Sequence, residues 1–244
     1  FNVNEIRKDF PILKTKTNSG NDLIYFDNSA TTLKPKVVID AVSNYYEKMT
    51  ANVHRGDYDL SHNVDSEYEL TRKVVASFIN AQKEEIVFTN GATSGINMVS
   101  FGLKEMIIRE NDEIIISEAE HASNILPWYR VADEKKAKIV FVPLDNEGRI
   151  TTKNLLKVIT PRTKIISLAH VGNVLGYTLD VKGIAKICKE KGIIFVVDGA
   201  QGIPHQKIDV KDLDCDFYIF SSHKMLGPSG VGVVYGKLDL LEEM

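Results

Sequence analysis

Short apolar runs alternate with longer amphipathic stretches over most of the chain. From residue 85 onward there are seven such runs, in the segments EEIVFTN, DEIIISE, AKIVFVPL, TKIISLAH, IIFVVDG, CDFYIF and GVGVVYG. Most of these runs are continuous rather than alternating, which is typical of strands covered on both faces of a parallel sheet. The pattern therefore predicts an α/β fold, a three-layer αβα arrangement around a mostly parallel seven-stranded sheet.

The stretches between these runs have helical periodicity. In the segment 91–107, apolar residues recur at helical spacing, at Ile96, Val99, Leu103 and Ile107. Three further segments of similar pattern are expected to be helices: 124–136, 151–159 and 181–192. We expect Thr151 or Thr152 to cap the second of these and Gly192 to end the third.

The first 80 residues are less regular. We expect a short helix over 4–13 that Pro11 stops, and a short strand from residue 23 that runs into a polar turn. Helices are expected over 34–49 and 66–80, and the polar segment 50–65 between them is expected to form turns.

The composition is that of an ordinary globular protein. Of the 244 residues, 43% are hydrophobic and 26% are charged, and the net charge is −3. This balance gives no support for a nucleic-acid or anionic-membrane surface, and no apolar run approaches the roughly 20 residues of a membrane span. The first residues lack the basic region of a signal peptide. Cys188 and Cys215 have no CxxC spacing, so no metal site is predicted and a cytoplasmic location is expected.

Polar and small residues follow five of the predicted strands, in the segments TNGATSGIN, EAEHASN, AHVGNVLG, DGAQG and SSHK. The carboxyl ends of parallel strands meet at one edge of a sheet, where ligands of α/β proteins bind. In the first segment, glycines and hydroxyls open a helix, whose free N–H groups and dipole suit a phosphate. An ordinary capped helix would use the same residues.

Two further strand ends carry residues with two interpretations each. His121 is either a hydrogen-bonded residue at the sheet edge or a residue for ring stacking and proton transfer. Asn173 is either a turn asparagine or a donor to a ligand oxygen.

Asp198 and Lys224 are the groups that predict a cofactor. Asp198 directly follows an apolar strand, so its carboxylate either caps the next turn or holds a cation such as a protonated ring nitrogen. Lys224 lies between His223 and a Gly-Pro loop, and is either a solvated lysine or a nucleophile. Together with a phosphate site, the lysine and the acid predict a Schiff base between Lys224 and pyridoxal 5′-phosphate.

The segments FTNGATSGIN, SEAEHASNILPW, AHVGNVLG, VVDGAQG and SSHKMLGPSGVGVVYG together resemble the cysteine desulfurases. These are pyridoxal-phosphate enzymes of the class V aminotransferase group, with the type I fold. The segments YFDNSATTLKPKVVIDA and ANVHRGDYDLS resemble the second desulfurase group, which includes SufS-type and selenocysteine lyase-like enzymes. The resemblance extends from about Phe10 to the last residue.

The resemblance implies roles for individual residues. Lys224 would bind the cofactor covalently and shuttle a proton, Asp198 would pair with the pyridinium, and His121 would stack on the ring in the catalytic site. Further cofactor contacts are implied for Ala92, Thr93, Asn173, Gln201, Ser221 and His223. Substrate contacts are implied for Ala30, Arg55 and Asn173. Ala92 departs from the family, where many relatives have a second hydroxyl before Thr93.

The implied reaction converts L-cysteine to L-alanine and passes sulfur, as an enzyme persulfide, to an acceptor protein for iron–sulfur cluster assembly. A homodimer is implied as well. The family's persulfide cysteine and its substrate-carboxylate arginine would lie beyond Met244, so we expect this chain to be part of a longer polypeptide and, alone, to bind cofactor poorly. Residues 1–17 would be an arm of the small domain and 18–244 the cofactor-binding large domain, with a C-terminal small domain absent.

Other functions remain open at this point. A selenocysteine lyase, or another enzyme of the class V aminotransferase type, would share this domain. A non-catalytic scaffold could keep the fold as well, although the presence of both Lys224 and Asp198 argues against it.

Overall fold

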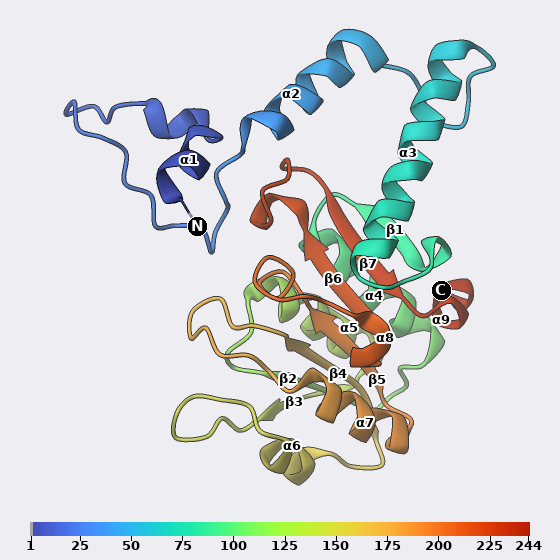
Figure 1. Cartoon of the computed structure of the whole chain (residues 1–244). Helices are drawn as coiled ribbons and strands as arrows, with labels where there is room; N and C mark the ends of the chain where they lie inside the picture. Colours follow the sequence, from blue (N-terminus) through green and yellow to red (C-terminus); the bar gives the residue numbers. More distant parts are fainter. Residues whose placement is uncertain (1) are drawn as a thin grey trace.

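A seven-stranded mixed sheet with helices on both faces forms the body of the protein (Figure 1). The computed structural model describes residues 2–244. The strands are β1 (Ile86–Thr89), β2 (Glu113–Ser117), β3 (Lys138–Val142), β4 (Thr163–Ala169), β5 (Ile194–Asp198), β6 (Phe217–Ser221) and β7 (Gly232–Gly236). Their order is β1-β7-β6-β5-β4-β2-β3. The predicted fold class and the seven predicted strands are confirmed.

Strand β7 is antiparallel to both of its neighbours, whereas the other neighbouring strands are parallel. A parallel neighbour requires a long crossover, usually through a helix. No helix of that length follows β6: the chain returns directly from Ser221 to Gly232, which are paired in the register of the two strands. The loop between them carries Lys224, so the antiparallel return places this lysine at the carboxyl end of the parallel strands.

Helices α4 (Ala92–Met106) and α5 (Leu126–Lys135) contribute to one core, and α6 (Thr152–Val158), α7 (Val181–Lys191) and α8 (Val210–Leu213) contribute to the other. Successive residues of a strand point to opposite faces. Accordingly, Ile114 and Ile116 of β2 belong to one core and Ile115 to the other. This two-sided burial is why the strands are continuous apolar runs. The last helix is α9 (Leu238–Glu243).

The predicted helix ends are confirmed. The Thr151 side chain accepts a hydrogen bond from the Asn154 N–H at the start of α6. Gly192 ends α7 with a left-handed backbone, at φ 64°. None of the helices described is long and apolar enough to cross a membrane.

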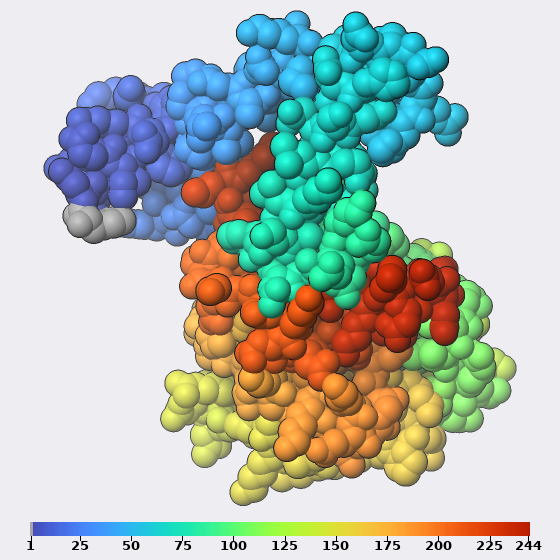
Figure 2. Space-filling view, turned by 45° about the vertical axis from the view of Figure 1, so that its right-hand side comes forward, coloured from blue at the N-terminus to red at the C-terminus, as the bar shows by residue number. Residues whose placement is uncertain are grey.

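The first elements of the chain stand apart from the sheet, as the blue lobe of Figure 2 shows. They are α1 (Val3–Lys8), η1 (Pro11–Lys14), α2 (Lys36–Asn44) and the π-helical turn η2 (Tyr45–Met49). The next elements, α3 (Asp59–Phe78) and η3 (Lys83–Glu85), lead onto the sheet, where Ala76 of α3 joins the core and Arg72 donates to the Ile86 carbonyl of β1. Phe1, in the predicted arm 1–17, lies outside the described residues. The boundary of that arm stays a prediction.

Two predictions in this region are wrong. No strand forms from residue 23, where Ile24 and Phe26 are 75% and 92% exposed, because the segment has no sheet edge to pair with. The turn segment predicted for 50–65 is also too long. Helix α3 begins at Asp59, so the polar residues that follow form its first turns.

Candidate active site

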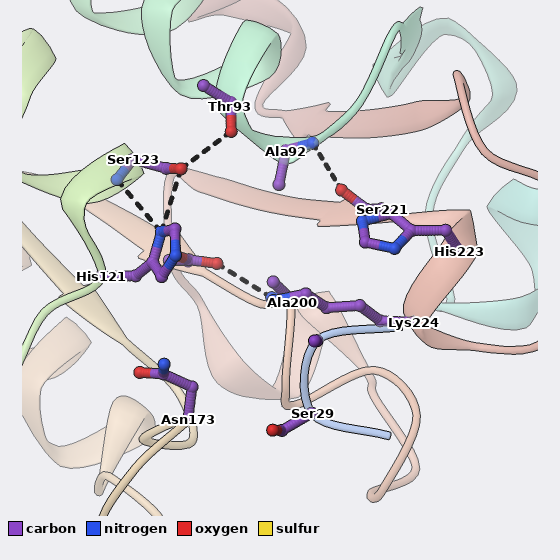
Figure 3. A pocket seen from close by; sticks show the side chains of 12 residues that line it. Ser29, Ala92, Thr93, His121, Ser123, Asn173, Ala200, Ser221, His223 and Lys224 are labelled. Atoms are coloured by element: carbon purple, nitrogen blue, oxygen red, sulfur yellow. Dashed lines mark hydrogen bonds between the residues drawn. The ribbon is translucent and has the colours of Figure 1, made fainter. Parts of the chain in front are cut away.

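A cavity of about 370 Å³ lies at the carboxyl ends of the parallel strands (Figure 3). The chain segments after β1, β2, β4, β5 and β6 contribute to it, together with the turn before α2. Its lining residues are Ser29, Ala30, Ala92, Thr93, His121, Ser123, Asn173, Asp198, Ala200, Ser221, His223 and Lys224. The predicted convergence of strand ends therefore occurs within this chain.

The N-terminus of α4 opens into this cavity. The Ala92 N–H donates to Ser221 Oγ at 2.7 Å, which ties the start of the helix to the end of β6. The residue before it, Gly91, has φ 152°, a backbone conformation that favours glycine. A side chain at Gly232 would collide with the Gly91 backbone at about 2.4 Å, so β7 can pass the helix only with a glycine there. The first N–H groups of a 15-residue helix thus lie at the cavity.

Asp198 is the buried charge of the site, with 6% of the residue exposed. The Ala200 N–H donates to its Oδ1 at 2.9 Å. Burial raises the pKa of Asp198, and this effect is opposed by the Ala200 N–H, by the charge of Lys224 and by a protonated His121 ring. A cation placed in the cavity next to this carboxylate would favour its ionised form.

His121 precedes the short helix η4 (Ala122–Asn124), and its ring is held by a neighbour. Its Nδ1 accepts a hydrogen bond from the Ser123 N–H at 3.1 Å and lies 3.0 Å from Ser123 Oγ. The Ser123 hydroxyl in turn lies 2.8 Å from Thr93 Oγ1, on α4. The hydroxyl groups thus connect two of the predicted site residues.

The last residue of the short helix η5 (Ser222–Lys224) is Lys224, and the carbonyl group before it is held by several donors. His223 O accepts hydrogen bonds from Thr32 N–H and Thr32 Oγ1, both at 3.0 Å, from Thr31 Oγ1 at 3.1 Å, and from Lys34 Nζ at 2.8 Å. Burial lowers the pKa of Lys34. Burial, together with the charges of Lys224 and Lys34, lowers the pKa of His223.

Gln201 fastens the same segment to the end of β5. Its Nε2 donates to Ser29 O at 2.6 Å, and the residue is buried. We call residues 29–34 the N-terminal strap, because the strap is bonded to the chain after both β5 and β6. It keeps a wall of the cavity in place even though the elements before it stand apart from the sheet.

Glu120 lies behind His121, in the core next to the cavity. Its carboxylate accepts hydrogen bonds from Ser117 Oγ at 2.9 Å and from Asn124 Nδ2 at 2.8 Å. Asn124 Oδ1 accepts from Ser167 Oγ at 2.6 Å and from the Trp128 indole N–H at 3.3 Å. Burial raises the pKa of Glu120 to about 7, despite these donors and the Ala169 N–H.

Nine of the predicted site residues line the cavity, and two do not. Gln201 uses its amide to hold the strap. Arg55 lies exposed in the turn before α3 and is not part of the cavity lining. Their contacts with cofactor and substrate stay predictions. Sequence reasoning missed three lining residues, Ser29, Ser123 and Ala200. Ser123 had a detectable signal, because it belongs to EAEHASN, one of the polar segments that follow a predicted strand.

Comparison with known proteins assigns the chain to a family. Residues 24–244 match the aminotransferase class-V family. The chain belongs to this family. The class-V chain is 43% identical, over its whole length, to a probable cysteine desulfurase of Vibrio cholerae, and 46% identical to one of Halalkalibacterium halodurans. It spans 60% of the length of each of these relatives.

The fold agrees with that of solved desulfurases. The apo structure of a cysteine desulfurase from Thermococcus onnurineus superposes with a TM-score of 0.90 at 41% identity, covering 99% of this chain and 58% of that one. The expected resemblance to the cysteine desulfurases is confirmed. Among residues 2–244, no group of three or more His, Cys, Asp or Glu side chains is placed to hold a metal ion.

Proposed function

We propose that the protein to which this class-V chain belongs is a pyridoxal 5′-phosphate-dependent cysteine desulfurase. One observation carries the proposal: Lys224, Asp198 and the N-terminus of α4 line a single cavity. These groups match an aldehyde, a ring nitrogen and a phosphate, which are the three polar parts of that cofactor. The relatives named as cysteine desulfurases support the choice of reaction.

The residues present fit the cofactor. Asp198 is a buried carboxylate that accepts a hydrogen bond from the Ala200 N–H, and a protonated ring nitrogen would supply the positive partner that burial demands. The start of α4 offers N–H groups and a positive dipole to a phosphate, beside Ser221 and His223. When bound, the cofactor supplies an electron sink for bonds broken at the substrate.

The side chains would divide the work as follows. Lys224 would hold the cofactor through its aldehyde, and its amine would move a proton at the substrate α-carbon. Asp198 would keep the ring nitrogen protonated. His121 would pack against the ring. Thr93 would add a hydroxyl to the phosphate site, and Asn173 would donate to the ring hydroxyl or to the substrate carboxylate.

In the overall reaction, the carbon–sulfur bond of L-cysteine breaks and a protein thiol receives the sulfur. L-cysteine and a thiol thereby give L-alanine and a persulfide, without an external oxidant or reductant. Cys188 and Cys215 are both free, buried and outside the cavity, and burial raises the pKa of both thiols. We therefore assign the accepting thiol to another part of the whole protein.

The setting of the enzyme is part of the same proposal. We expect a homodimer that works in the cytoplasm and hands sulfur to an acceptor protein for iron–sulfur cluster assembly. Two unpaired cysteines are in keeping with a reducing compartment.

The full-length protein tests the proposal. Purified protein should be yellow, borohydride should fix the cofactor on Lys224, and L-cysteine should yield L-alanine and persulfide. Mass spectrometry locates the modified residue, and Lys211→Ala, which removes an exposed lysine outside the cavity, serves as the control. Protein that stays colourless at saturating cofactor would refute the proposal. Release of alanine from L-selenocysteine but not from L-cysteine would reassign it as a selenocysteine lyase.

A further inference from the structure

The hydrogen bond between Ser123 and His121 defines the protonation of one ring nitrogen. A backbone N–H can only donate, so the Ser123 N–H at 3.1 Å requires a lone pair on His121 Nδ1. The contact is a helix cap, in which the His121 side chain accepts from the second residue of η4. A proton on Nδ1 would place two donors against each other at this distance.

The Ser123 hydroxyl adds a second donor to the same nitrogen. Ser123 Oγ lies 3.0 Å from Nδ1, and because Nδ1 is the acceptor, the hydroxyl must donate. Its oxygen can then accept the proton of Thr93 Oγ1 at 2.8 Å. The two hydroxyl hydrogen bonds that Figure 3 draws at Ser123 therefore run in one direction, from Thr93 through Ser123 to His121.

We infer that Ser123 is a positioning residue that holds neutral His121 in the tautomer with the proton on Nε2. Since Nδ1 is occupied by Ser123, the nitrogen that can give or take a proton in the cavity is Nε2. The inference rests on the proposed function only for its catalytic meaning, namely which atom of His121 exchanges protons with bound substrate. The tautomer itself is a property of the protein without any ligand.

The test is nitrogen NMR of the full-length protein with labelled histidine, before cofactor or substrate is added. The spectra distinguish a nitrogen that carries a proton from one that does not, and His121→Gln identifies the signals by their loss. We expect His121 to be unprotonated at Nδ1 and protonated at Nε2 in its neutral form. A proton on Nδ1 in the wild type would overturn the inference.

Ser123→Ala isolates the hydroxyl, because it keeps the backbone N–H. The excess of the Nε2–H tautomer should fall about fivefold, the change that corresponds to the loss of one ordinary hydrogen bond. Ser123→Thr should restore it. The matched control is Ser94→Ala. Ser94 lies on the same helix as Thr93, and its hydroxyl donates to Gly91 O, so this substitution should leave the ratio of the two His121 tautomers unchanged.

If the ratio of the His121 tautomers is unchanged in Ser123→Ala, the Ser123 hydroxyl does not have the role assigned to it.

The test of the tautomer and the test of the proposed function can fail independently of each other. A protein that releases alanine from cysteine but has Nδ1 protonated overturns only the tautomer, and a protein with the expected tautomer that binds no cofactor overturns only the desulfurase.

Discussion

The buried carboxyl of Glu120 should make the free energy of unfolding fall as the pH rises through neutrality. Burial raises its pKa from the ordinary 4.5 to about 7, so between these values the folded protein holds a proton that the unfolded chain has released. The contribution of Glu120 to the free energy of unfolding is complete below the ordinary pKa of 4.5 and is lost as the pH rises through the shifted pKa of about 7. Between about pH 5 and pH 8 the loss amounts to about 2–3 kcal/mol.

The perturbation that isolates this effect is Glu120→Gln, because a glutamine does not ionise. The NH2 group of the glutamine, unlike the O–H of a protonated carboxyl, cannot accept a hydrogen bond from Asn124 or Ser117, so the variant should be less stable at acidic pH, by about 1–3 kcal/mol. As the pH rises, the free energy of unfolding of the wild type should fall because Glu120 ionises. Glu120→Gln has no such group, so the difference in stability between the two proteins should shrink. His170, whose pKa burial lowers to about 4, titrates in both proteins and cancels in the difference.

Urea unfolding at a series of pH values measures the effect. Trp128 is fully buried and donates to Asn124 in the same network, so its fluorescence reports unfolding around Glu120. The exposed Glu118 provides the control variant, Glu118→Gln. A difference between wild type and Glu120→Gln that stays constant across this pH range would refute the reasoning.

Other predictions address the site and the core. Lys224→Ala should reduce alanine formation by at least about a thousandfold while cofactor still binds noncovalently, as shown by assay and dialysis. Asp198→Ala should also slow turnover, and an unchanged kcat would exclude its role at the ring nitrogen. Lys34→Met should lower the free energy of unfolding by about 1–2 kcal/mol, measured in urea, because the His223 carbonyl loses its charged donor. Cys188 and Cys215 should react with thiol reagents only after unfolding, since both are buried; rapid labelling of the native protein would contradict their burial.

Local pattern was sufficient for the elements of the sheet. Each strand contributes apolar residues to both cores, so its apolar run is visible without knowledge of its neighbours. The same pattern failed from residue 23, where apolar residues lie in the N-terminal segment and find no partner strand. An extended segment is stable only when its backbone groups are paired, and pairing depends on residues far away in the sequence.

The residue types of the candidate site were visible in the sequence because strand ends in parallel sheets meet at one edge. Lys224, Asp198 and His121 could therefore be placed at one edge because each follows the end of a predicted strand. Their fine arrangement could not, since it depends on contacts across the chain. The strap bonds to His223 from about 190 positions away, and Thr93 meets Ser123 across 30 positions. The sequence by itself determined which groups are present and at which edge they gather; the tertiary structure decided which donor faces which acceptor, because hydrogen bonds depend on distances and angles that no local pattern contains.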